Sequence, residues 1–150
     1  MVRDDELGPA VNSRLSYLFK RLYLELGALH EELLAPFGIS AGDLAILLLI
    51  DAGEPESQQQ MARRLDRDRT TMVALIDALE GEGLVVRRPD PADRRRNVVE
   101  LTEAGRTTLR QAKRSSDQAE QLLLAGLDEA EATQLRSLLR RVAADSDRDR

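Results

Sequence analysis

The chain has 150 residues and a formal net charge of −5, with 42% hydrophobic but only 3% aromatic residues. This length and composition predict one compact domain whose core consists mainly of Leu, Val, Ile and Ala. The sequence contains no cysteine, which excludes disulfides, thiolate catalysis and cysteine-ligated zinc.

The charge is distributed unevenly along the chain. Between Gln58 and Asn97, nine Arg outnumber seven acidic residues and give a net charge of +2, whereas the remainder carries −7. A surface that binds DNA can be positive on a protein that is acidic overall. The total charge therefore does not exclude a nucleic-acid partner for the central segment.

Nothing in the sequence indicates a membrane or secretory segment. The most apolar run, Leu44–Ile50, is far too short to span a bilayer, and the chain does not start with a basic segment followed by a long apolar run. We therefore expect a soluble, cytoplasmic protein. Met1–Leu7 is polar and Asp145–Arg150 is a charged tail, and we expect the first of these to be frayed.

The first long element is predicted from spacing. Apolar residues recur every three or four positions, the mark of an amphipathic helix, at Leu15, Leu18, Phe19, Leu22, Leu26, Leu29 and Leu33. Pro9 suits its first turn and Pro36 its end, so the helix is expected over about residues 9–35. Because such a helix is long for a small domain, we interpret part of the apolar stripe as an oligomer surface.

Three capping signals divide the following segment into helices. They are Ser40 with Asp43, Ser57 with Gln60, and Asp68. The first helix is apolar on nearly all sides and should be buried. The next two are short and joined by about three residues, which is a helix-turn-helix pattern. In the second of these, we expect four residues to face inward, namely Met72, Leu75, Ile76 and Leu79, and five to face outward, namely Arg69, Thr70, Val73, Ala74 and Asp77.

Two strands and two helices complete the prediction. Leu84–Arg88 and Asn97–Leu101 alternate apolar and polar residues at a period of two, with Leu84, Val86, Val99 and Leu101 on the apolar face. Helices follow over about 103–144, the last beginning at Asp128 and directing Leu135, Leu138, Leu139 and Val142 inward. The fold class is therefore mainly α with a small β-wing. We expect a single domain, 1–150, in which a helix-turn-helix lobe with its wing covers about 40–101 and is flanked by N- and C-terminal helices over about 9–35 and 103–144.

The second helix of the helix-turn-helix has residues suited to a DNA major groove at its start. Arg69 can form bidentate bonds to guanine, and Thr70 and Thr71 can bond a base or contact a thymine methyl. The alternative is that the two threonines are ordinary first-turn residues and that Arg69 is solvated.

The loop between the strands carries three consecutive arginines, Arg94, Arg95 and Arg96. Arginine inserted into a narrow minor groove gains from the negative potential there. We expect Asp93 to hold the Arg95 side chain by a charge-assisted bond. The alternative is a solvated turn with a surface ion pair, but the position directly after a helix-turn-helix favours DNA binding.

Three motifs here resemble the MarR family of winged helix-turn-helix regulators. They are Leu79-Glu-Gly-Glu-Gly83-Leu-Val, Arg88-Pro-Asp-Pro-Ala-Asp93-Arg-Arg95 and Val99-x-Leu-Thr102-x-Ala-Gly105, and the helix order agrees from Pro9 to Val142. The resemblance implies a homodimer held by the first helix and the last two, which binds a pseudo-palindromic operator, usually as a repressor. It also implies a cleft for a small aromatic acid or phenol between the dimer helices and the DNA-binding lobe.

By position, the resemblance assigns DNA contacts to Arg69, Thr70, Thr71 and Arg95, with Asp93 as the partner of Arg95. One departure is Ala74, which stands where many family members have a polar or basic base-reading residue.

Two residues of the first helix are candidates for binding an effector. Arg14 and Tyr17 could bind a carboxylate and a ring, but the sequence favours a solvated Arg14 and a Tyr17 in the dimer core. His30 is the only histidine, and we expect it at the surface, with no metal and no cofactor. An enzyme is disfavoured because there is no phosphate-binding glycine loop and no histidine or cysteine nucleophile pairing. The remaining alternative is a winged-helix module that binds protein and not DNA.

Overall fold

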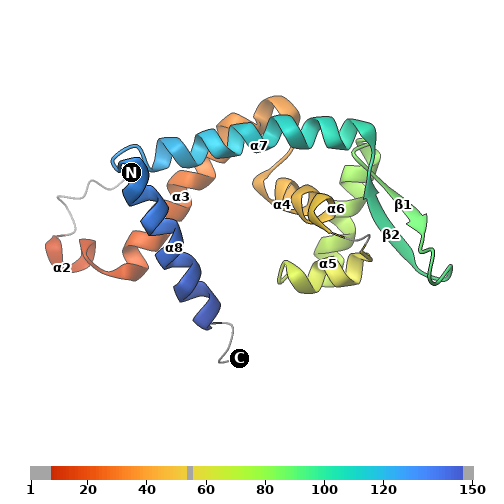
Figure 1. Cartoon of the computed structure of the whole chain (residues 1–150), viewed down its shortest axis with the longest axis horizontal. Coiled ribbons are helices and arrows are strands. Elements are labelled where there is room, and N and C mark those ends of the chain that lie inside the picture. Colours follow the sequence, from red (N-terminus) through yellow and green to blue (C-terminus); the bar gives the residue numbers. More distant parts are fainter. Residues whose placement is uncertain (1–7, 54–55, 147–150) are drawn as a thin grey trace. The chain divides into compact units, whose positions relative to one another are not determined.

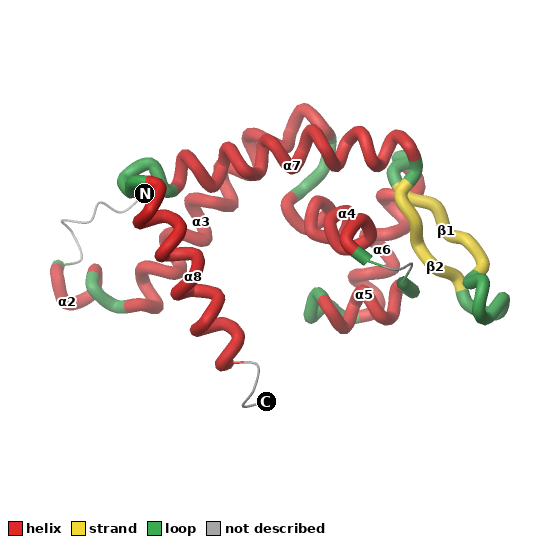
Figure 2. The backbone as a smooth tube through the Cα atoms, viewed as in Figure 1, coloured by secondary structure: helices red, strands yellow, loops and turns green. Residues whose placement is uncertain are grey.

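The computed structural model describes residues 8–53 and 56–146. The predictions for Met1–Leu7 and for the last residues of the charged tail lie outside the described residues. In chain order the elements are α2 (Pro9–Asn12), α3 (Leu15–Leu34), the 3-10 turn η1 (Ala35–Phe37), α4 (Ala41–Ala52), α5 (Gln58–Arg64), α6 (Arg69–Gly81), β1 (Val85–Pro89), β2 (Asn97–Leu101), α7 (Glu103–Leu123) and α8 (Glu129–Ser146). The predicted class, mainly helical with one two-stranded antiparallel sheet, is confirmed (Figures 1 and 2).

The chain forms two compact units. One consists of the described parts of Met1–Leu26 and Gln118–Arg150, and the other is Gly27–Asp117. Each of the long helices α3 and α7 contributes one part to each unit. We call the first the terminal unit and the second, which contains α4, α5, α6 and the sheet, the winged unit.

The predicted first helix is interrupted near its start. The structure has a short α2 that stops at Asn12, and α3 begins only at Leu15. At the break, the Ser13 hydroxyl donates a hydrogen bond to the carbonyl oxygen of Pro9 at 2.9 Å. Serine side chains compete in this way with the helical backbone pattern, so the continuous helix over 9–35 was wrong at its first turn.

The capped helices of the winged unit are confirmed. Ser40 and Ser57 each form a reciprocal capping box, with Asp43 and Gln60 respectively. As its composition predicts, α4 is central, and its Leu44, Ile46 and Leu47 are buried. The core combines these residues with others from six further elements, among them Leu34, Met61, Met72, Ile76, Leu79, Val85, Val99 and Leu109.

The turn between α6 and β1 changes the predicted phase of the first strand. Gly83 has a positive φ of 75°. Its amide donates to the backbone carbonyl of Glu80, and the Leu84 amide donates to the backbone carbonyl of Leu79, each at 2.9 Å. This pair of bonds is a Schellman C-cap, in which the residue after the glycine packs back on the helix. Leu84 is therefore buried as part of the helix end and is not the first residue of the strand.

The strand pairing follows from this shift. Val85 lies opposite Leu101, and Arg87 lies opposite Val99. Since paired residues share a face of the sheet, Val85 and not Val86 accompanies Val99 and Leu101 on the buried face. The prediction that Val86 faces inward was wrong in phase, and the same shift moves Arg87 to the inner face.

The base of the wing is attached to the start of α7. The Thr102 amide donates to the Leu84 carbonyl at 3.1 Å, and the Thr102 hydroxyl donates to the Gly83 carbonyl at 2.6 Å. The Gly105 amide donates in turn to the Thr102 hydroxyl oxygen at 3.0 Å. A Cβ on Gly105 would overlap the Leu84 carbonyl oxygen and lie 2.9 Å from its carbon. Only glycine therefore permits this close approach.

In the terminal unit, Leu135 of α8 is half-buried, but the inward placement expected for the other three apolar residues of this helix was wrong. Leu138, Leu139 and Val142 are 46%, 43% and 62% exposed. On the first half of α3, the exposed apolar residues Leu15, Leu18, Phe19 and Leu22 belong to the stripe that we interpreted as an oligomer surface. An ion pair between Arg136 and Glu120 joins α8 to α7. The described helices of this unit form too few layers to cover their own apolar faces.

Within the described ranges, no single helix is long and apolar enough to span a membrane, and only the pair Leu15–Phe37 and Ala41–Ala52, bent by 70°, meets the length and composition test jointly.

Candidate nucleic-acid interface

Asp68 organises the N-terminus of α6. Its carboxylate accepts the Thr71 amide at 2.8 Å and the Thr71 hydroxyl, which confirms it as the N-cap. The bond from the Thr71 hydroxyl, followed by that from the Thr71 amide, lowers the pKa of the Asp68 carboxyl below its ordinary 3.8. The cap is therefore ionised at neutral pH.

This cap divides the roles of the three predicted contact residues. Because the Thr71 hydroxyl donates its hydrogen to Asp68, it can offer DNA only its lone pairs and its methyl group. Arg69 and Thr70 are exposed, so their donors point to solvent. The base-reading capacity of the helix start therefore lies mainly in Arg69 and Thr70.

The two faces of α6 are as expected. Met72, Ile76 and Leu79 are buried, and Leu75 packs partly buried against the core. On the other side Ala74 and Asp77 are exposed, and Val73 is half-buried. Ala74 can provide only apolar contact at the centre of the outer face.

The wing tip is a tight loop held by aspartate side chains. The Asp90 carboxylate accepts the Ala92 amide at 2.8 Å, and the Asp93 carboxylate accepts the Arg95 amide at 3.1 Å. Aspartate side chains commonly stabilise turns in this way. The bond from Asp93 is thus to the backbone of Arg95, whereas we expected a bond to its guanidinium. Asp93 fixes the path of the chain at the tip and leaves the Arg95 side chain exposed.

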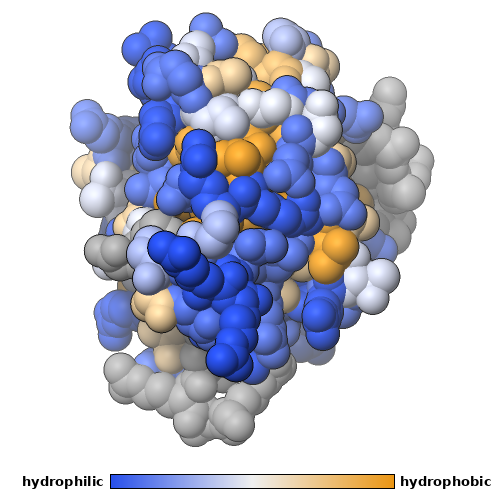
Figure 3. All heavy atoms as spheres, turned by 90° about the vertical axis from the view of Figure 1, so that its right-hand side faces the viewer, coloured by the Kyte–Doolittle hydropathy of each residue, from blue (hydrophilic) through white to orange (hydrophobic). Residues whose placement is uncertain are grey.

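The three wing arginines differ in their surroundings. All are exposed, but Arg96 also donates to the Ser57 hydroxyl, the N-cap of α5, at 3.5 Å. Among the ion pairs of residues 8–53 and 56–146, none involves Arg69, Arg94 or Arg95. These three guanidinium groups are available for an external anion. Figure 3 is turned so that the side of Figure 1 with β1 and β2 faces the viewer, and the atoms seen there are largely hydrophilic.

Sequence reasoning missed Arg87, which faces inward from β1 and bonds to α5 and α6. The alternation of apolar and polar residues placed Arg87 on the solvent face, because the predicted strand assigned inward and outward positions one residue out of step. A usable signal was present in Asp77 and Glu80, two acidic residues three positions apart on one side of α6.

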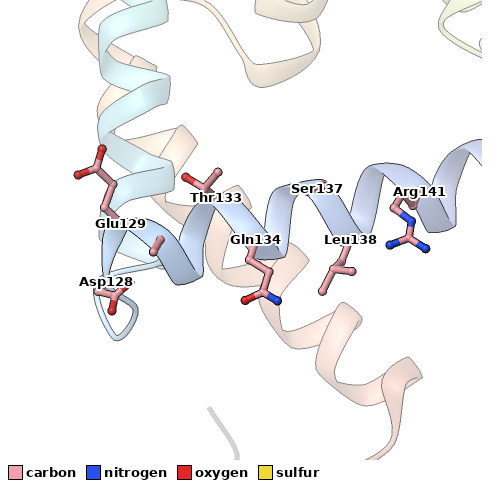
Figure 4. A pocket seen from close by; sticks show the side chains of 8 residues that line it. Asp128, Glu129, Thr133, Gln134, Ser137, Leu138 and Arg141 are labelled. Atoms are coloured by element: carbon pink, nitrogen blue, oxygen red, sulfur yellow. The ribbon is translucent and has the colours of Figure 1, made fainter.

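The effector residues predicted from sequence are not brought into a described hollow. Arg14 is exposed just before α3, and Tyr17 is half-buried on α3. Neither lines the hollow of about 870 Å³ beside α8 or that of about 600 Å³ next to His30. The first runs along one side of α8, from which Gln134 and Leu138 extend together (Figure 4).

His30 is less exposed than we expected. It is half-buried, and its Nε2 lies 3.0 Å from the Ser116 hydroxyl of α7. In the part of the chain that the structure describes, no group of three or more histidine, cysteine or acidic residues is arranged to hold a metal ion.

A helix-turn-helix followed by a two-stranded wing, with free arginines at both, defines a winged helix-turn-helix DNA-binding protein. The model of the MarR family matches residues 39–96. The structure of the transcriptional repressor CouR bound to a 23-mer DNA duplex is 33% identical, with a TM-score of 0.82 over 95% of this chain and 99% of that one. The chain belongs to the MarR family, whose members are DNA-binding transcription regulators and not enzymes.

Two further relatives are similar. CouR from Rhodococcus jostii RHA1 bound to p-coumaroyl-CoA is 29% identical, with a TM-score of 0.79 over 91% of this chain and 96% of that one. A putative transcriptional regulatory protein for the hcr operon of Thauera aromatica is 32% identical over 70% of this chain. The chain spans 63% of the length of that relative.

Proposed function

We propose that this protein is a homodimeric, sequence-specific repressor that binds a pseudo-palindromic operator and is released from it by a small ligand. The observation that carries the proposal is the pair of exposed cationic sites on the winged unit. One is Arg69 at the start of α6, and the other is Arg94 with Arg95 at the wing tip. Both are built on capped, hydrogen-bonded backbone, and neither is neutralised by an ion pair within the described residues.

Each site suits one groove. The start of α6 presents Arg69 and Thr70, residue types that read base edges in the major groove. The wing tip presents arginine side chains on a narrow loop, the form in which arginine enters a minor groove. In this proposal α6 reads the sequence, while Arg94 and Arg95 add affinity and sensitivity to groove width. Arg96, which donates to Ser57, contributes mainly to the wing's attachment.

The dimer surface proposed here lies on the terminal unit. The exposed apolar side chains of α3 and α8 form it, together with the end of α7, where Leu122 is 50% exposed. Isolated exposed leucines are ordinary, but so many on neighbouring helices mark an interaction surface. A partner's helices would also fill the hollow beside α8. The dimer must place two α6 helices about one DNA turn apart, on the order of 34 Å.

The effector is proposed to be a small aromatic acid or a phenolic compound. The support is the p-coumaroyl-CoA bound by CouR together with the family membership. A ligand that binds the free protein better than the DNA-bound protein needs a coupling of only about 1–3 kcal/mol to act as an inducer. Thermal shift assays with p-coumarate and p-coumaroyl-CoA test this part separately from DNA binding.

The decisive test starts with selection of bound sequences from random duplex DNA by the full-length protein. Two half-sites with centres about 10 base pairs, or a multiple of the helical turn, apart are expected. Arg95→Ala should then weaken operator binding by about tenfold or more while the dimer persists. Arg114→Ala, the same change at an exposed position of α7, is the matched control and should bind like wild type.

The competing function is a protein-interaction module. It predicts that neither selection nor filter binding to random duplex at low salt retains DNA above background. An Arg95→Ala variant with unchanged operator affinity would remove the wing from the proposal and leave α6 as the sole contact.

A further inference from the structure

Arg87 is shielded by the protein, although it lies in the wing among arginines that face solvent. It pairs with Val99 in the sheet, so it occupies the face that packs on the core. Its side chain is 19% exposed, whereas that of the neighbouring Arg88 is 62% exposed. Arg88 points to the other face and pairs with Glu100 across the strands at 3.1 Å. Arg87 is therefore poorly placed to contact DNA itself.

The donors of Arg87 connect three elements. Its backbone amide donates to Glu80 Oε1 at 3.0 Å. Its guanidinium donates to the other Glu80 oxygen and to the Asp77 carboxylate, both on α6, and to Gln58 Oε1 on α5 at 2.9 Å. One side chain on the first strand of the wing thus holds the recognition helix and the N-terminus of the helix before it.

Only arginine can make this set of bonds. A guanidinium offers five donors in a rigid plane, whereas a lysine ammonium is a compact charge that cannot span acceptors on two helices in the same way. The bond from the Arg87 amide, with the guanidinium contributing further, lowers the pKa of the Glu80 carboxyl below its ordinary 4.5. The Glu80 carboxyl therefore stays ionised, and the guanidinium between Glu80 and Asp77 offsets negative charge that α6 would otherwise present near phosphate.

We infer that Arg87 is a positioning residue that fixes the wing against the recognition helix, so that α6 and the wing tip reach adjacent grooves of the same duplex. The inference rests on the two-groove binding proposed above. The turn at Gly83 and the Thr102 bonds fix only the base of the wing. The Arg87 network acts further along the strand, towards the tip, and directly against α6.

The test uses Arg87→Met, which keeps most of the side-chain length but removes all donors, on the operator recovered by selection. Methylation protection of guanine N7 reports major-groove contact, and hydroxyl-radical protection reports the minor groove. With protein at saturation, the variant should keep guanine protection by α6 and lose the minor-groove protection by the wing. Its affinity should fall by about tenfold or more, the effect of displacing one of two reading elements.

A double-mutant cycle with Arg95→Ala separates positioning from general destabilisation. If Arg87 acts by placing the wing, Arg87→Met with Arg95→Ala should bind hardly more weakly than Arg87→Met alone. Arg88→Met is the matched control from the adjacent position and should keep both protections. Arg87→Lys retains the charge and should recover only part of the minor-groove protection.

Glu80→Gln provides a second variant in case Arg87→Met does not fold. This variant keeps the shape of the side chain and one hydrogen-bond acceptor, so it should fold, which circular dichroism can verify. It should lose part of the minor-groove protection and keep the guanine protection. Loss of both protections in parallel, or retention of both, would overturn the inference for Arg87. A wild-type protein that protects no DNA would instead overturn the proposed function, so the two failures are distinguishable.

Discussion

Replacement of Gly105 by alanine tests the attachment of the wing to α7. A Cβ at this position would overlap the Leu84 carbonyl oxygen and lie 2.9 Å from the carbonyl carbon. Carbon atoms in contact normally lie about 3.5–4.0 Å apart. The backbone of Leu84 must therefore move away from residue 105 by at least about 0.6 Å. The obstacle is backbone, which cannot rotate away as a flexible side chain could.

This displacement of the Leu84 backbone destabilises the folded protein in two ways. Overpacking costs about 1–3 kcal/mol, and the bond from the Thr102 amide to the Leu84 carbonyl, 3.1 Å long, would lengthen at a cost of about 1 kcal/mol. The total is about 2–4 kcal/mol of the free energy of unfolding. At about 2–4 °C for each kcal/mol in a protein of this size, the melting temperature should fall by about 10 °C.

Calorimetry at one fixed protein concentration measures the effect, since the melting temperature of an oligomer depends on concentration. Gly27→Ala is the control, because Gly27 lies inside α3 with nothing within 4 Å of an added Cβ. It should raise stability by about 0.5–1 kcal/mol, the ordinary preference for alanine in a helix. A Gly105→Ala protein that melts within about 1 °C of wild type would refute this account of the wing base, since the expected fall is several times larger.

Two further predictions concern the α6 cap and the dimer surface. Because the pKa of Asp68 is depressed in the folded protein, its stabilisation is present at neutral pH and is lost as the pH falls from about the ordinary 3.8 through the lower folded value. Asp68→Asn, which can still cap, should flatten the dependence of melting temperature on pH in this window, and an unchanged acid profile would contradict the assignment. Leu139→Glu places a charge on the proposed dimer surface, where Leu139 is 43% exposed. It should shift the protein to monomers in light scattering and weaken operator binding at least tenfold, because each half-site is then bound alone. A fully dimeric Leu139→Glu protein would place the interface elsewhere.

Local chemistry was sufficient to predict the helix-turn-helix. Ser40, Ser57 and Asp68 cap their helices through residues three positions later, so the signals lie within a single turn of sequence. The wing was predicted for a similar reason, since its strands are adjacent in the chain and joined by a loop rich in aspartate and arginine. The positions of Arg69, Thr70, Arg94 and Arg95 on the surface followed from those elements.

The tertiary structure decided what depends on partners distant in sequence. The C-cap at Gly83 removed Leu84 from the strand, reversed the inward and outward positions of β1, and brought Arg87 to Gln58, 29 residues away. An alternation of apolar and polar residues does not show which residue is the first of the strand. In the same way, Leu138 and Leu139 of α8 read as core in sequence, and only the packed chain shows that no other part of the described terminal unit buries them. The sequence thus determined the local elements and the chemistry of the exposed tips of α6 and the wing, while tertiary packing decided which arginines face solvent and which one bonds inward to α5 and α6.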